Sequence, residues 1–421
     1  MAYPTQPTLP PVPWLQAAPL QRLMTLLNTE GAATRLVGGC VRNALLGLPV
    51  TDIDLATTLP PAAVMERLSA AGIQSIPTGL AHGTVTAVVD HQNIEITTLR
   101  IDVTTDGRRA EVAFTDDWQA DAARRDLTLN ALYADADGTV FDPLGGLEDV
   151  RARRVRFIGD PAARIREDAL RILRFFRFVA CLQPGALPLD PAALAACREL
   201  AVLLETLSGE RIQKEMLRLL TAPSPPGPLR AMADCGILER LSLPPALSDA
   251  TETWLGQLCA LEGDSPSPLR RLCVLADGQR DRLAALAAHW KLSRRDADHL
   301  TALARIAAEN PALDDPVARW LLLDAVPFGV FADALTLFFA RRAGDPQTLG
   351  TELKAILETA TADKHKPFPL SGYDLMARGI PAGPQLGELL HQGRRLWAAS
   401  GFTLQGIDIL DKISKDKSYP S

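Results

Sequence analysis

Residues 36–59, with the sequence LVGGCVRNALLGLPVTDIDLATTL, constrain the fold more than any other segment of the chain. A short apolar run breaks at Gly38-Gly39 and continues as a helix-like stretch that contains Arg42. The chain then becomes extended around Asp52 and Asp54. Residues two apart on a strand project to the same face, so these two carboxylates are predicted to point the same way. Like charges side by side repel each other, and a divalent cation removes that repulsion.

The glycine pair and the carboxylates each predict one half of a nucleotide site. Gly38 and Gly39 allow the backbone to approach a ligand closely, and the following helix presents N–H groups to an anion, with Arg42 adding charge. Asp52 and Asp54 are predicted to bind Mg2+, which takes one or two carboxylates together with water and substrate phosphates. Alone, a glycine pair usually forms a turn and a DxD sequence usually lies at a solvated strand end. Their order and spacing here favour a triphosphate site followed by a metal-binding strand.

Length and composition predict a chain of several domains with no membrane segment. At 421 residues and 47% hydrophobic content, roughly two to four domains with buried cores are expected. Six cysteines without a CxxC pair indicate neither a zinc site nor a disulfide framework, which fits a reducing cytoplasm. There is no apolar run of about 18 residues and no signal peptide, and the proline-rich N-terminus is expected to be flexible. We therefore expect a cytoplasmic protein, and nothing in the sequence implies a protein partner.

Two β-like segments, residues 82–90 and 93–100, are separated by a short polar turn and are predicted to form a hairpin. Glu95 lies on the second segment. It is either a third carboxylate beside the aspartate pair, acting as a base or an outer metal ligand, or a strand residue that faces solvent. Arg100 is expected to end this strand. Residues 101–120 are polar and of mixed charge, and they are predicted to form a mobile loop.

The sequence RRDLTLNALY follows at residues 124–133. Asp126 comes directly after two arginines, so it could accept a hydrogen bond from a ribose hydroxyl while Arg125 holds a phosphate. Asn130 could reach the nucleotide or a metal-bound water. The alternative is helix capping, since an aspartate before an apolar run makes a good helix N-terminus. After the glycine pair and the DxD sequence, we favour nucleotide binding.

Arginines concentrate between Arg151 and Arg177. This stretch contains nine arginines and three acidic residues, an excess of six positive charges in a chain whose net charge is −6. A basic segment on an acidic protein can bind polyanions selectively. The alternative is a solvated helix face, and we favour binding.

Within the same stretch, a short strand over residues 155–158 is expected to lead into one long helix. On that helix, Glu167, Asp168, Arg171 and Arg174 are spaced by three and four and would share a face. An aspartate and an arginine three apart can present an acceptor and a donor fork to the edge of cytosine or adenine. A row of intrahelical salt bridges is the alternative, which this helix alone would favour. With the preceding motifs present, we favour recognition of a base.

These motifs resemble those of the class II CCA-adding tRNA nucleotidyltransferases, a family shared with bacterial poly(A) polymerases. The similarity is specific over residues 36–177 and continues weakly through SGERIQKE at residues 208–215. It implies an α+β fold, in which a polymerase β-like head with a small mixed sheet and helices precedes an all-α neck, body and tail. This sequence departs from the family at Asn43, where the family often has aspartate, and it contains no HD-type phosphohydrolase domain.

The resemblance implies template-free addition of CCA to the 3′ end of tRNA from CTP and ATP. It also implies that the loop at residues 101–120 helps to switch specificity from CTP to ATP. The implied catalytic residues are Asp52, Asp54 and Glu95, with Asp52 and Asp54 as Mg2+ ligands. The resemblance implies Gly38, Gly39 and Arg42 at the triphosphate, and Arg125 and Asp126 at the ribose and phosphates. It implies Asp168 and Arg171 as the amino-acid template for the incoming base, with Glu167 and Arg174 in support. Asn130 is a further candidate for nucleotide binding.

We expect five parts along the chain. They are an N-terminal extension and helix (1–30), a catalytic head (31–140), a neck with the base-recognising helix (141–204), a helical body (205–345) and a helical tail that contacts tRNA (346–421). In the tail, a glycine- and proline-containing turn at residues 379–387 opens a helix. Its N–H groups either bind an RNA phosphate or simply form a tight helix–helix turn.

Three other functions fit parts of this pattern. A poly(A) polymerase, or an enzyme that adds only CC or only A, would share the fold and the chemistry. A rival from another class is an RNA-binding protein that has lost catalysis. The presence of Asp52, Asp54, Arg125 and Asp126 argues against that rival.

Overall fold

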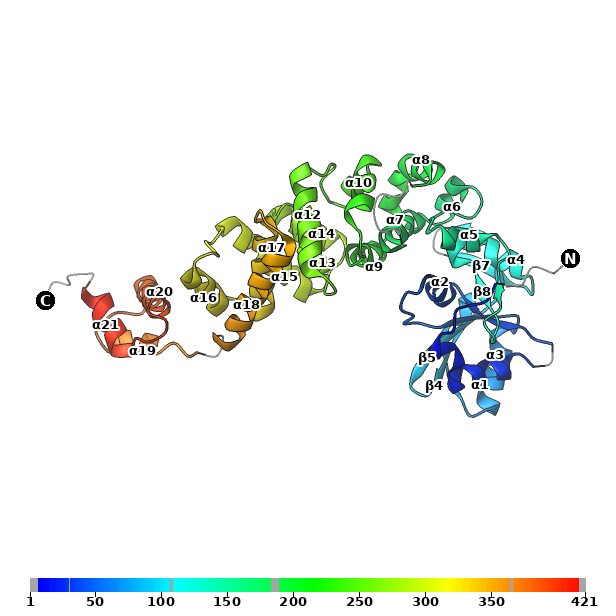
Figure 1. Ribbon diagram of the computed structural model, residues 1–421, viewed down its shortest axis with the longest axis horizontal. Helices are drawn as coiled ribbons and strands as arrows, with labels where there is room; N and C mark the ends of the chain where they lie inside the picture. The colour runs from blue at the N-terminus through cyan, green and yellow to red at the C-terminus, as the bar shows by residue number, and fades with distance from the viewer. Residues whose placement is uncertain (1–6, 30, 107–108, 183–188, 364–365, 416–421) are drawn as a thin grey trace. The chain divides into compact units, whose positions relative to one another are not determined.

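The computed structural model describes residues 7–415 except 30, 107–108, 183–188 and 364–365, and it describes side chains except at 102–111 and 414–415 (Figure 1). The chain divides into two compact units, residues 1–241 and 242–421. The first contains a mixed sheet with surrounding helices, and the described part of the second is helical. This arrangement confirms the predicted fold class. Across the described residues, every helix is too short or too polar to cross a membrane.

A seven-stranded sheet forms the centre of the N-terminal half of unit 1–241, with the strand order β3-β4-β5-β2-β1-β8-β9. Its strands are β1 (Thr34–Val37), β2 (Asp54–Thr57), β3 (Gln74–Gly79), β4 (Thr84–Val89), β5 (Gln92–Thr98), β8 (Tyr133–Ala134) and β9 (Val140–Phe141). Only β2 and β5 pair in parallel, and the other neighbours are antiparallel. The parallel register aligns Asp54 with Glu95, so the sheet itself brings two predicted site residues together.

The N-terminal extension is ordered from residue 7, contrary to the flexible segment that we expected. Thr8 forms an antiparallel bridge with Thr139, and Leu9 donates its N–H to the carbonyl oxygen of Gly138 at 2.8 Å. Leu9 and Leu15 are both buried. The apolar side chains of this extension therefore hold it against the edge of the sheet. Residues 1–6 lie outside the described part of the chain.

Two hairpins follow one another in the head. The first, β4–β5, confirms the prediction, and its turn residues Asp90 and His91 have φ values of 48° and 65°, as in the primed turns that suit hairpins. The second joins β6 (Arg100–Asp106) and β7 (Arg109–Phe114). The predicted loop over residues 101–120 is therefore wrong. Apolar and β-branched residues alternate with polar ones in both strands, which favours extended structure over a loop. Arg100 accordingly begins β6 and does not end β5.

Helices and 3-10 turns connect and cover the strands of this unit. Helices α1 and α3 contact each other and the neighbouring strands, whereas α2 contacts β1 and α5. Several of the helices begin with proline in the first turn, where its missing N–H costs nothing. The helical elements up to residue 151 are η1 (Pro13–Gln16), α1 (Ala18–Leu27), α2 (Gly39–Leu46), α3 (Pro61–Ala70), η2 (Leu80–His82), α4 (Trp118–Ala123), η3 (Thr128–Asn130) and α5 (Gly146–Arg151).

Further helices follow α5 within unit 1–241. The segment at residues 155–158 is not a strand, since only an isolated bridge between Leu127 and Phe157 forms there. The elements that follow are α6 (Pro161–Glu167), α7 (Leu170–Leu182), α8 (Pro191–Glu199), η4 (Ala201–Thr206), α9 (Gly209–Leu220), α10 (Pro226–Asp234) and α11 (Ile237–Arg240). Helix α7 buries Phe175 and Phe176 completely, and it packs against α9 and α10.

The single helix expected to carry Glu167 and Asp168 together with Arg171 is broken in two. Helix α6 ends at Glu167, and Asp168 has extended backbone angles, φ −155° and ψ 108°. Its carboxylate accepts the N–H of Leu170 at 3.1 Å, which satisfies a first-turn donor of α7. An aspartate offers the backbone this alternative to a continuous helix. The expectation that these residues share one helical face is therefore wrong.

Unit 242–421 is helical throughout its described residues, as predicted for body and tail. Among the helices after α13, aromatic side chains such as Trp320, Trp397 and Phe402 pack against one another. The helices are α12 (Asp249–Glu262), α13 (Pro268–Leu275), α14 (Arg280–His289), α15 (Arg294–Glu309), α16 (Pro316–Ala325), α17 (Phe328–Arg341), α18 (Pro346–Asp363), α19 (Gly372–Met376), α20 (Pro384–Ala399) and α21 (Gly406–Lys415). All six cysteines of the chain are free thiols.

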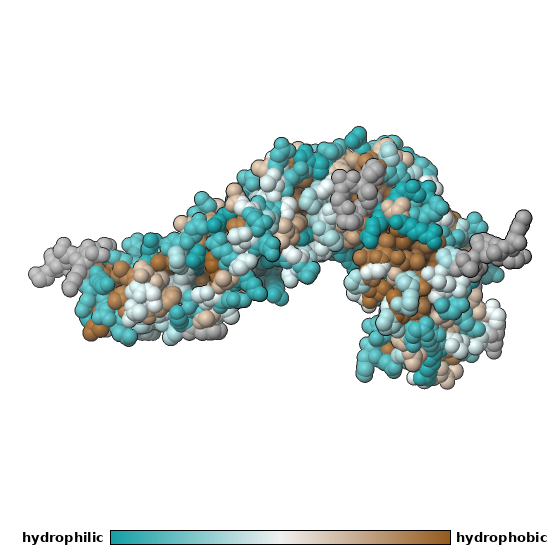
Figure 2. All heavy atoms as spheres, viewed as in Figure 1, coloured by the Kyte–Doolittle hydropathy of each residue, from teal (hydrophilic) through white to brown (hydrophobic). Residues whose placement is uncertain are grey.

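Apolar side chains also reach the surface near α2. In Figure 2, hydrophobic residues gather where Figure 1 draws that helix. Leu45, Leu46, Leu48 and Val50, at the end of α2 and just after it, are all half-buried. These apolar residues come just before Asp52 in the sequence.

Candidate active site

The glycine pair lies where β1 ends and α2 begins. Gly38 has φ 71° and ψ −115°, a conformation that side chains disfavour. A Cβ atom on Gly38 would lie 3.5 Å from the carbonyl oxygen of Asn130 and 3.9 Å from Nη1 of Arg125. No side chain caps α2, and the first N–H groups of a helix have no intrahelical acceptor. The turn therefore presents backbone donors beside a guanidinium group, which suits an anionic ligand.

Three carboxylates gather next to this turn. Asp54 opens β2, but Asp52 lies before the strand and is exposed, so the prediction that both occupy one strand is right only for Asp54. Burial, then the charges of Glu95 and Asp52, raise the pKa of Asp54 to about 6, with Arg125 acting in the opposite direction. The three acidic groups therefore interact, and repulsion of this kind is relieved by a cation.

The donor set at this position consists of carboxylate oxygens. Hard divalent cations such as Mg2+ prefer oxygen ligands and commonly keep several waters. Within the described residues, no group of three or more His, Cys, Asp or Glu side chains is arranged to hold a metal ion. Asp52 and Asp54, with Glu95 beside them, are the residues that fit a divalent ion completed by water and substrate phosphate.

Arg42 on α2 is held in place by two asparagines. It donates from Nη1 to the side-chain oxygen of Asn130, and from Nε and Nη2 to that of Asn43 at 3.1 and 2.8 Å. Burial and the charge of Arg177 lower the pKa of Arg42 to about 10, so it stays protonated at neutral pH. Asn43, where the resembling family often has aspartate, therefore orients Arg42 without contributing a charge. The Arg42 guanidinium also lies 4.8 Å from the ring centroid of Phe178 on α7.

Asp121 on α4 holds both arginines that precede Asp126. Its side chain is 1% exposed, and its oxygens accept from Arg124 at 2.6 and 2.9 Å and from Arg125 at 2.9 and 3.2 Å. The hydroxyl of Tyr133 donates to it at 2.7 Å. Burial alone raises the pKa of Asp121, but Arg125, Arg124 and Tyr133 together lower it to about 2. The sequence analysis did not identify Asp121, although its spacing of four from Arg125 was an available signal.

Asp126 is also enclosed by protein donors. It accepts from Nε of Arg174 at 2.6 Å, from Nδ2 of Asn130 at 3.1 Å and from the N–H of Leu127 at 2.8 Å. Burial alone raises the pKa of Asp126, but Arg174 and Asn130 lower it to about 2. Asp126 therefore joins Asn130, which holds Arg42, to Arg174 on α7.

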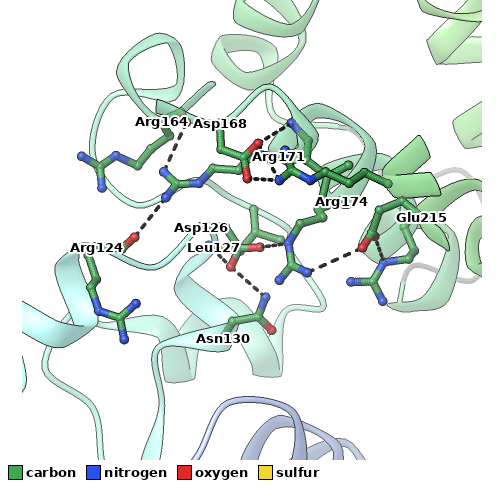
Figure 3. A network of polar contacts seen from close by, with 12 residues as sticks. Arg124, Asp126, Leu127, Asn130, Arg164, Asp168, Arg171, Arg174 and Glu215 are labelled. Atoms are coloured by element: carbon green, nitrogen blue, oxygen red, sulfur yellow. Dashed lines mark hydrogen bonds and ion pairs between the residues drawn. The ribbon is translucent and has the colours of Figure 1, made fainter. Parts of the chain in front are cut away.

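The residues predicted to recognise a base lie in one polar network (Figure 3). Arg171 donates from Nη1 to Glu167 at 2.6 Å and from Nη2 to the carbonyl oxygen of Arg124 at 3.1 Å. Asp168 instead pairs with Arg211 of α9 at 2.8 Å. The structure brings Asp168, Arg171 and Arg174 to the same region as Asp126. Arg211 is a member of this network that the sequence analysis did not single out.

The basic stretch between Arg151 and Arg177 is largely paired within its own unit. Arg154 and Arg156 contact Asp149 at 2.5 and 3.0 Å. Arg177 contacts the buried Glu215 at 2.7 Å. These carboxylates lie outside the stretch in the sequence, so its local charge excess is reduced in the fold. Any contribution to polyanion binding must come from the guanidinium groups that stay exposed, such as that of Arg154.

Comparison with known proteins gives consistent matches. Residues 34–156 match the family described as "Poly A polymerase head domain", and residues 187–250 match "Probable RNA and SrmB- binding site of polymerase A". The chain is 36% identical over 407 residues to the Homo sapiens "CCA tRNA nucleotidyltransferase 1, mitochondrial", covering 94% of this chain and 90% of the relative. It is 32% identical over 392 residues to the "CCA-adding enzyme" of Limosilactobacillus fermentum, covering 88% and 90%.

A solved structure shows the same fold over nearly the whole chain. It is the Bacillus stearothermophilus CCA-adding enzyme in complex with CTP, with a TM-score of 0.75 and 27% sequence identity. The superposition covers 94% of this chain and 98% of that protein. Fold and sequence thus agree over both units of the chain.

Proposed function

The chain belongs to the family of CCA tRNA nucleotidyltransferases, and we propose from this premise that it adds C, C and A to the 3′ end of tRNA. CTP and ATP are the substrates, and no nucleic-acid template is used. The terminal ribose hydroxyl of the tRNA attacks the α-phosphorus of the nucleotide, a new phosphodiester bond forms, and pyrophosphate leaves with the electrons of the broken bond. The observation that carries this proposal is the parallel register that aligns Asp54 with Glu95 beside the Gly38 turn.

We propose Mg2+ as the metal, held by Asp52 and Asp54. When bound, the ion neutralises these carboxylates and stabilises charge on the attacking and leaving oxygens. Glu95 is exposed on the neighbouring strand, and it is the third catalytic carboxylate, placed to receive the proton of the attacking hydroxyl. The oxygen-only donor set and the raised pKa of Asp54 support this assignment.

The remaining candidate residues divide between the triphosphate and the base. The lack of side chains at Gly38 and Gly39 allows the phosphates to approach the backbone closely. Arg42 and Arg125 supply positive charge there. Asn130 orients Arg42 and Asp126 pairs with Arg174, and both Asp126 and Asn130 are assigned to the region of the ribose. The base is recognised by Asp168, Arg171 and Arg174. A carboxylate accepts a hydrogen bond from the exocyclic amino group of cytosine or adenine, and a guanidinium donates hydrogen bonds to the ring acceptors.

The first test is nucleotide addition to a tRNA transcript that ends at the discriminator base. CTP alone should extend it by two residues, and a third should appear only when ATP is also present. A long ladder with ATP alone would mean a poly(A) polymerase, the alternative favoured by the description of the head-domain family. Arrest after CC with both nucleotides present, or addition of A alone, would mean a partial enzyme. No product would mean a catalytically inactive RNA-binding protein.

Replacing Asp168 by alanine should loosen the choice of nucleotide more than it weakens triphosphate binding. The side chain lies in the base-recognition network and not at the Gly38 turn. Relative addition rates with CTP, ATP, UTP and GTP would measure the effect, with pyrophosphate inhibition as a separate measure of the triphosphate site. Unchanged selectivity among the four nucleotides would refute the assigned role.

The division of the chain into head, neck, body and tail at the boundaries predicted above remains part of the proposal, as does contact of residues 346–421 with tRNA. A cytoplasmic location is likewise proposed from cysteine usage, whereas the human relative is named as mitochondrial. The contribution of the tail would be tested by measuring the affinity for tRNA of three proteins. They are the full-length chain, a chain truncated before residue 346, and residues 346–421 expressed separately.

A further inference from the structure

The two residues assigned to base recognition do not pair with each other in this structure. Asp168 and Arg171 are three apart in sequence, yet no ion pair joins their side chains in the described part of the chain. Nη2 of Arg211 instead contacts both oxygens of Asp168, at 2.8 and 3.0 Å. Arg211 lies in the first turn of α9, whereas Asp168 lies between α6 and α7. The pair therefore joins two elements that are 43 residues apart in sequence.

Arg171 has its own, separate set of partners. The carboxylate of Glu167 accepts from Arg171 at 2.6 Å. The backbone carbonyl oxygens of Arg164 and Arg124 accept from it at 3.2 and 3.1 Å (Figure 3). These contacts use Nη1 and one hydrogen of Nη2. A guanidinium has five N–H donors, so Nε–H and one Nη2–H of Arg171 find no acceptor within the described part of the chain. Arg171 is thus oriented by protein contacts and keeps donors that a base can use.

The Asp168 carboxylate likewise keeps acceptor capacity. One of its oxygens accepts from Arg211 and from the N–H of Leu170, and the other accepts from Arg211 only. An ionised carboxylate offers about four acceptor sites. The side chains of Asp168 and Arg211 are 27% and 28% exposed, so a ligand can reach them. Arg211 therefore fixes the orientation of the carboxylate without occupying all of its hydrogen-bond acceptor sites.

We propose that Arg211 is a specificity-determining positioning residue, which holds Asp168 away from Arg171 so that both stay open to the incoming base. The inference rests on the proposed function and deepens it. Without Arg211, the nearest guanidinium groups on α7, those of Arg171 and Arg174, would attract the Asp168 carboxylate. An Asp168–Arg171 ion pair would join the acceptor to the donor and withdraw both from the base.

This arrangement accounts for selection by chemistry of the base edge. Cytosine and adenine both present an exocyclic amino group, which a fixed carboxylate accepts. Uracil and guanine present a carbonyl oxygen at the corresponding position, which a carboxylate repels. Discrimination between these bases therefore depends on a carboxylate that is ionised and correctly oriented. Arg211 fixes that orientation.

The test uses the full-length protein and compares Arg211→Ala, Arg211→Lys and Lys214→Ala. Lys214 is an exposed cation on the same helix, so it controls for loss of one positive charge. kcat and KM would be measured for CTP and UTP on a tRNA transcript that lacks CCA, and for ATP and GTP on one that ends in CC. Pyrophosphate inhibition would probe the triphosphate site.

Arg211→Ala should lower the CTP-to-UTP ratio of kcat/KM by about tenfold or more, the size of one good base contact. The inhibition constant of pyrophosphate should stay within about twofold of wild type. Arg211→Lys should recover most of the ratio, because an ammonium group preserves the ion pair, and Lys214→Ala should leave it unchanged. A merely structural role would lower kcat for every nucleotide in proportion and leave the ratio intact, which would overturn the proposal.

A double-variant comparison tests whether Arg211 acts through Asp168. In an Asp168→Ala background, Arg211→Ala should change the nucleotide ratio no further, since coupled residues are not additive. Independent effects of the two changes would overturn the proposal. If Arg211→Ala does not fold, Arg211→Gln replaces it, because it keeps most of the stem. If wild type adds neither CTP nor ATP, it is the proposed function that fails; if wild type adds CCA and the Arg211 variants stay selective, the inference alone fails.

Discussion

Replacing Asp54 by asparagine is expected to lower nucleotide addition by about a thousandfold or more, while making the metal-free protein more stable at neutral pH. The loss of rate follows because the variant removes a carboxylate that we propose as a ligand of the catalytic ion, an effect worth roughly several kcal/mol in the transition state. The gain in stability follows because Asp54 is partly buried beside Glu95 and Asp52. An uncharged side chain of the same shape removes both the repulsion and the cost of burying a charge.

The pH dependence of this gain has a definite sign. The pKa of Asp54 is about 6 in the fold, above its value of 3.8 in a free aspartate. The folded, metal-free state therefore binds more protons than the unfolded state, and wild type loses stability as the pH rises from about 4 through about 6. The difference corresponds to about 3 kcal/mol at most. Asp54→Asn should unfold at the same denaturant concentration as wild type near pH 4 and at a higher one near pH 7, both in a chelator.

Asp52 provides the matched comparison for this experiment. Asp52→Ala should also abolish addition, because the same ion loses a ligand, but the exposed side chain gives little change in the free energy of unfolding. Circular dichroism and denaturant titration would establish folding of both variants, and addition of CTP to tRNA would measure activity. Wild-type-like activity in either variant would refute the assignment of the metal ligands.

The sequence predicted those parts of the site that depend on short-range order. The Gly38 turn requires a residue that tolerates positive φ, and only glycine does so freely, so the pair was readable directly. The approach of Glu95 to Asp54 was predicted only as an alternative, because strand order is a long-range property. The parallel pairing of β2 with β5 aligns the two residues, and the catalytic role of Glu95 stays a prediction. Local chemistry was thus more predictable than the partner strand.

The second hairpin was missed for a different reason. Residues 101–120 were judged by polarity, although apolar residues alternate with polar ones on each side of Asp106-Gly107. An Asp-Gly pair between alternating segments is a strong hairpin signal. Charged residues at alternate positions are compatible with a two-stranded ribbon, since such a ribbon buries little surface. Periodicity was the better guide here than composition.

The break between α6 and α7 and the pairing of Asp168 with Arg211 lay beyond sequence periodicity. A spacing of three and four predicted one charged face, but the Asp168 side chain instead caps the next helix and meets a residue of α9. Such a contact depends on how three helices pack together. Asp168 and Arg211 are partly buried, and the fold, not the spacing along the chain, determines which ionic groups lie close enough to pair.

Asp121, whose arginine partners are three and four residues away, carries the second large prediction. Asp121→Ala is expected to lower the free energy of unfolding by about 3–5 kcal/mol, the usual result of removing one partner from a buried ion pair. Arg124 and Arg125 are 15% and 19% exposed, so both would lose their carboxylate while remaining largely buried. The Tyr133 hydroxyl would lose its acceptor as well. Denaturant titration at neutral pH would measure the change.

The pKa of Asp121 gives this prediction its pH dependence. Its folded value of about 2 lies below the ordinary 3.8, so ionisation of this carboxylate stabilises the fold above about pH 4 and the contribution is lost as the pH falls through about 2. The difference in stability between wild type and the milder Asp121→Asn should therefore narrow between about pH 5 and about pH 3. A difference that stays constant over this range would contradict the assigned charge interaction.

An exposed aspartate in the same part of the chain provides a control. Its replacement shows how much stability is lost when an ordinary surface ion pair is removed. Asp135 pairs with Arg35 at 2.8 Å, but its side chain is 44% exposed, so Asp135→Asn should cost less than about 1 kcal/mol. Asp121→Asn should also slow nucleotide addition, because Arg125 would no longer be fixed beside Gly38 and Asp54. The loss should appear mainly as a higher KM for CTP, since Arg125 is assigned to the triphosphate. Activity equal to wild type in a folded Asp121→Asn protein would mean that Arg125 is positioned by the Tyr133 ring and the Gly38 turn without the carboxylate.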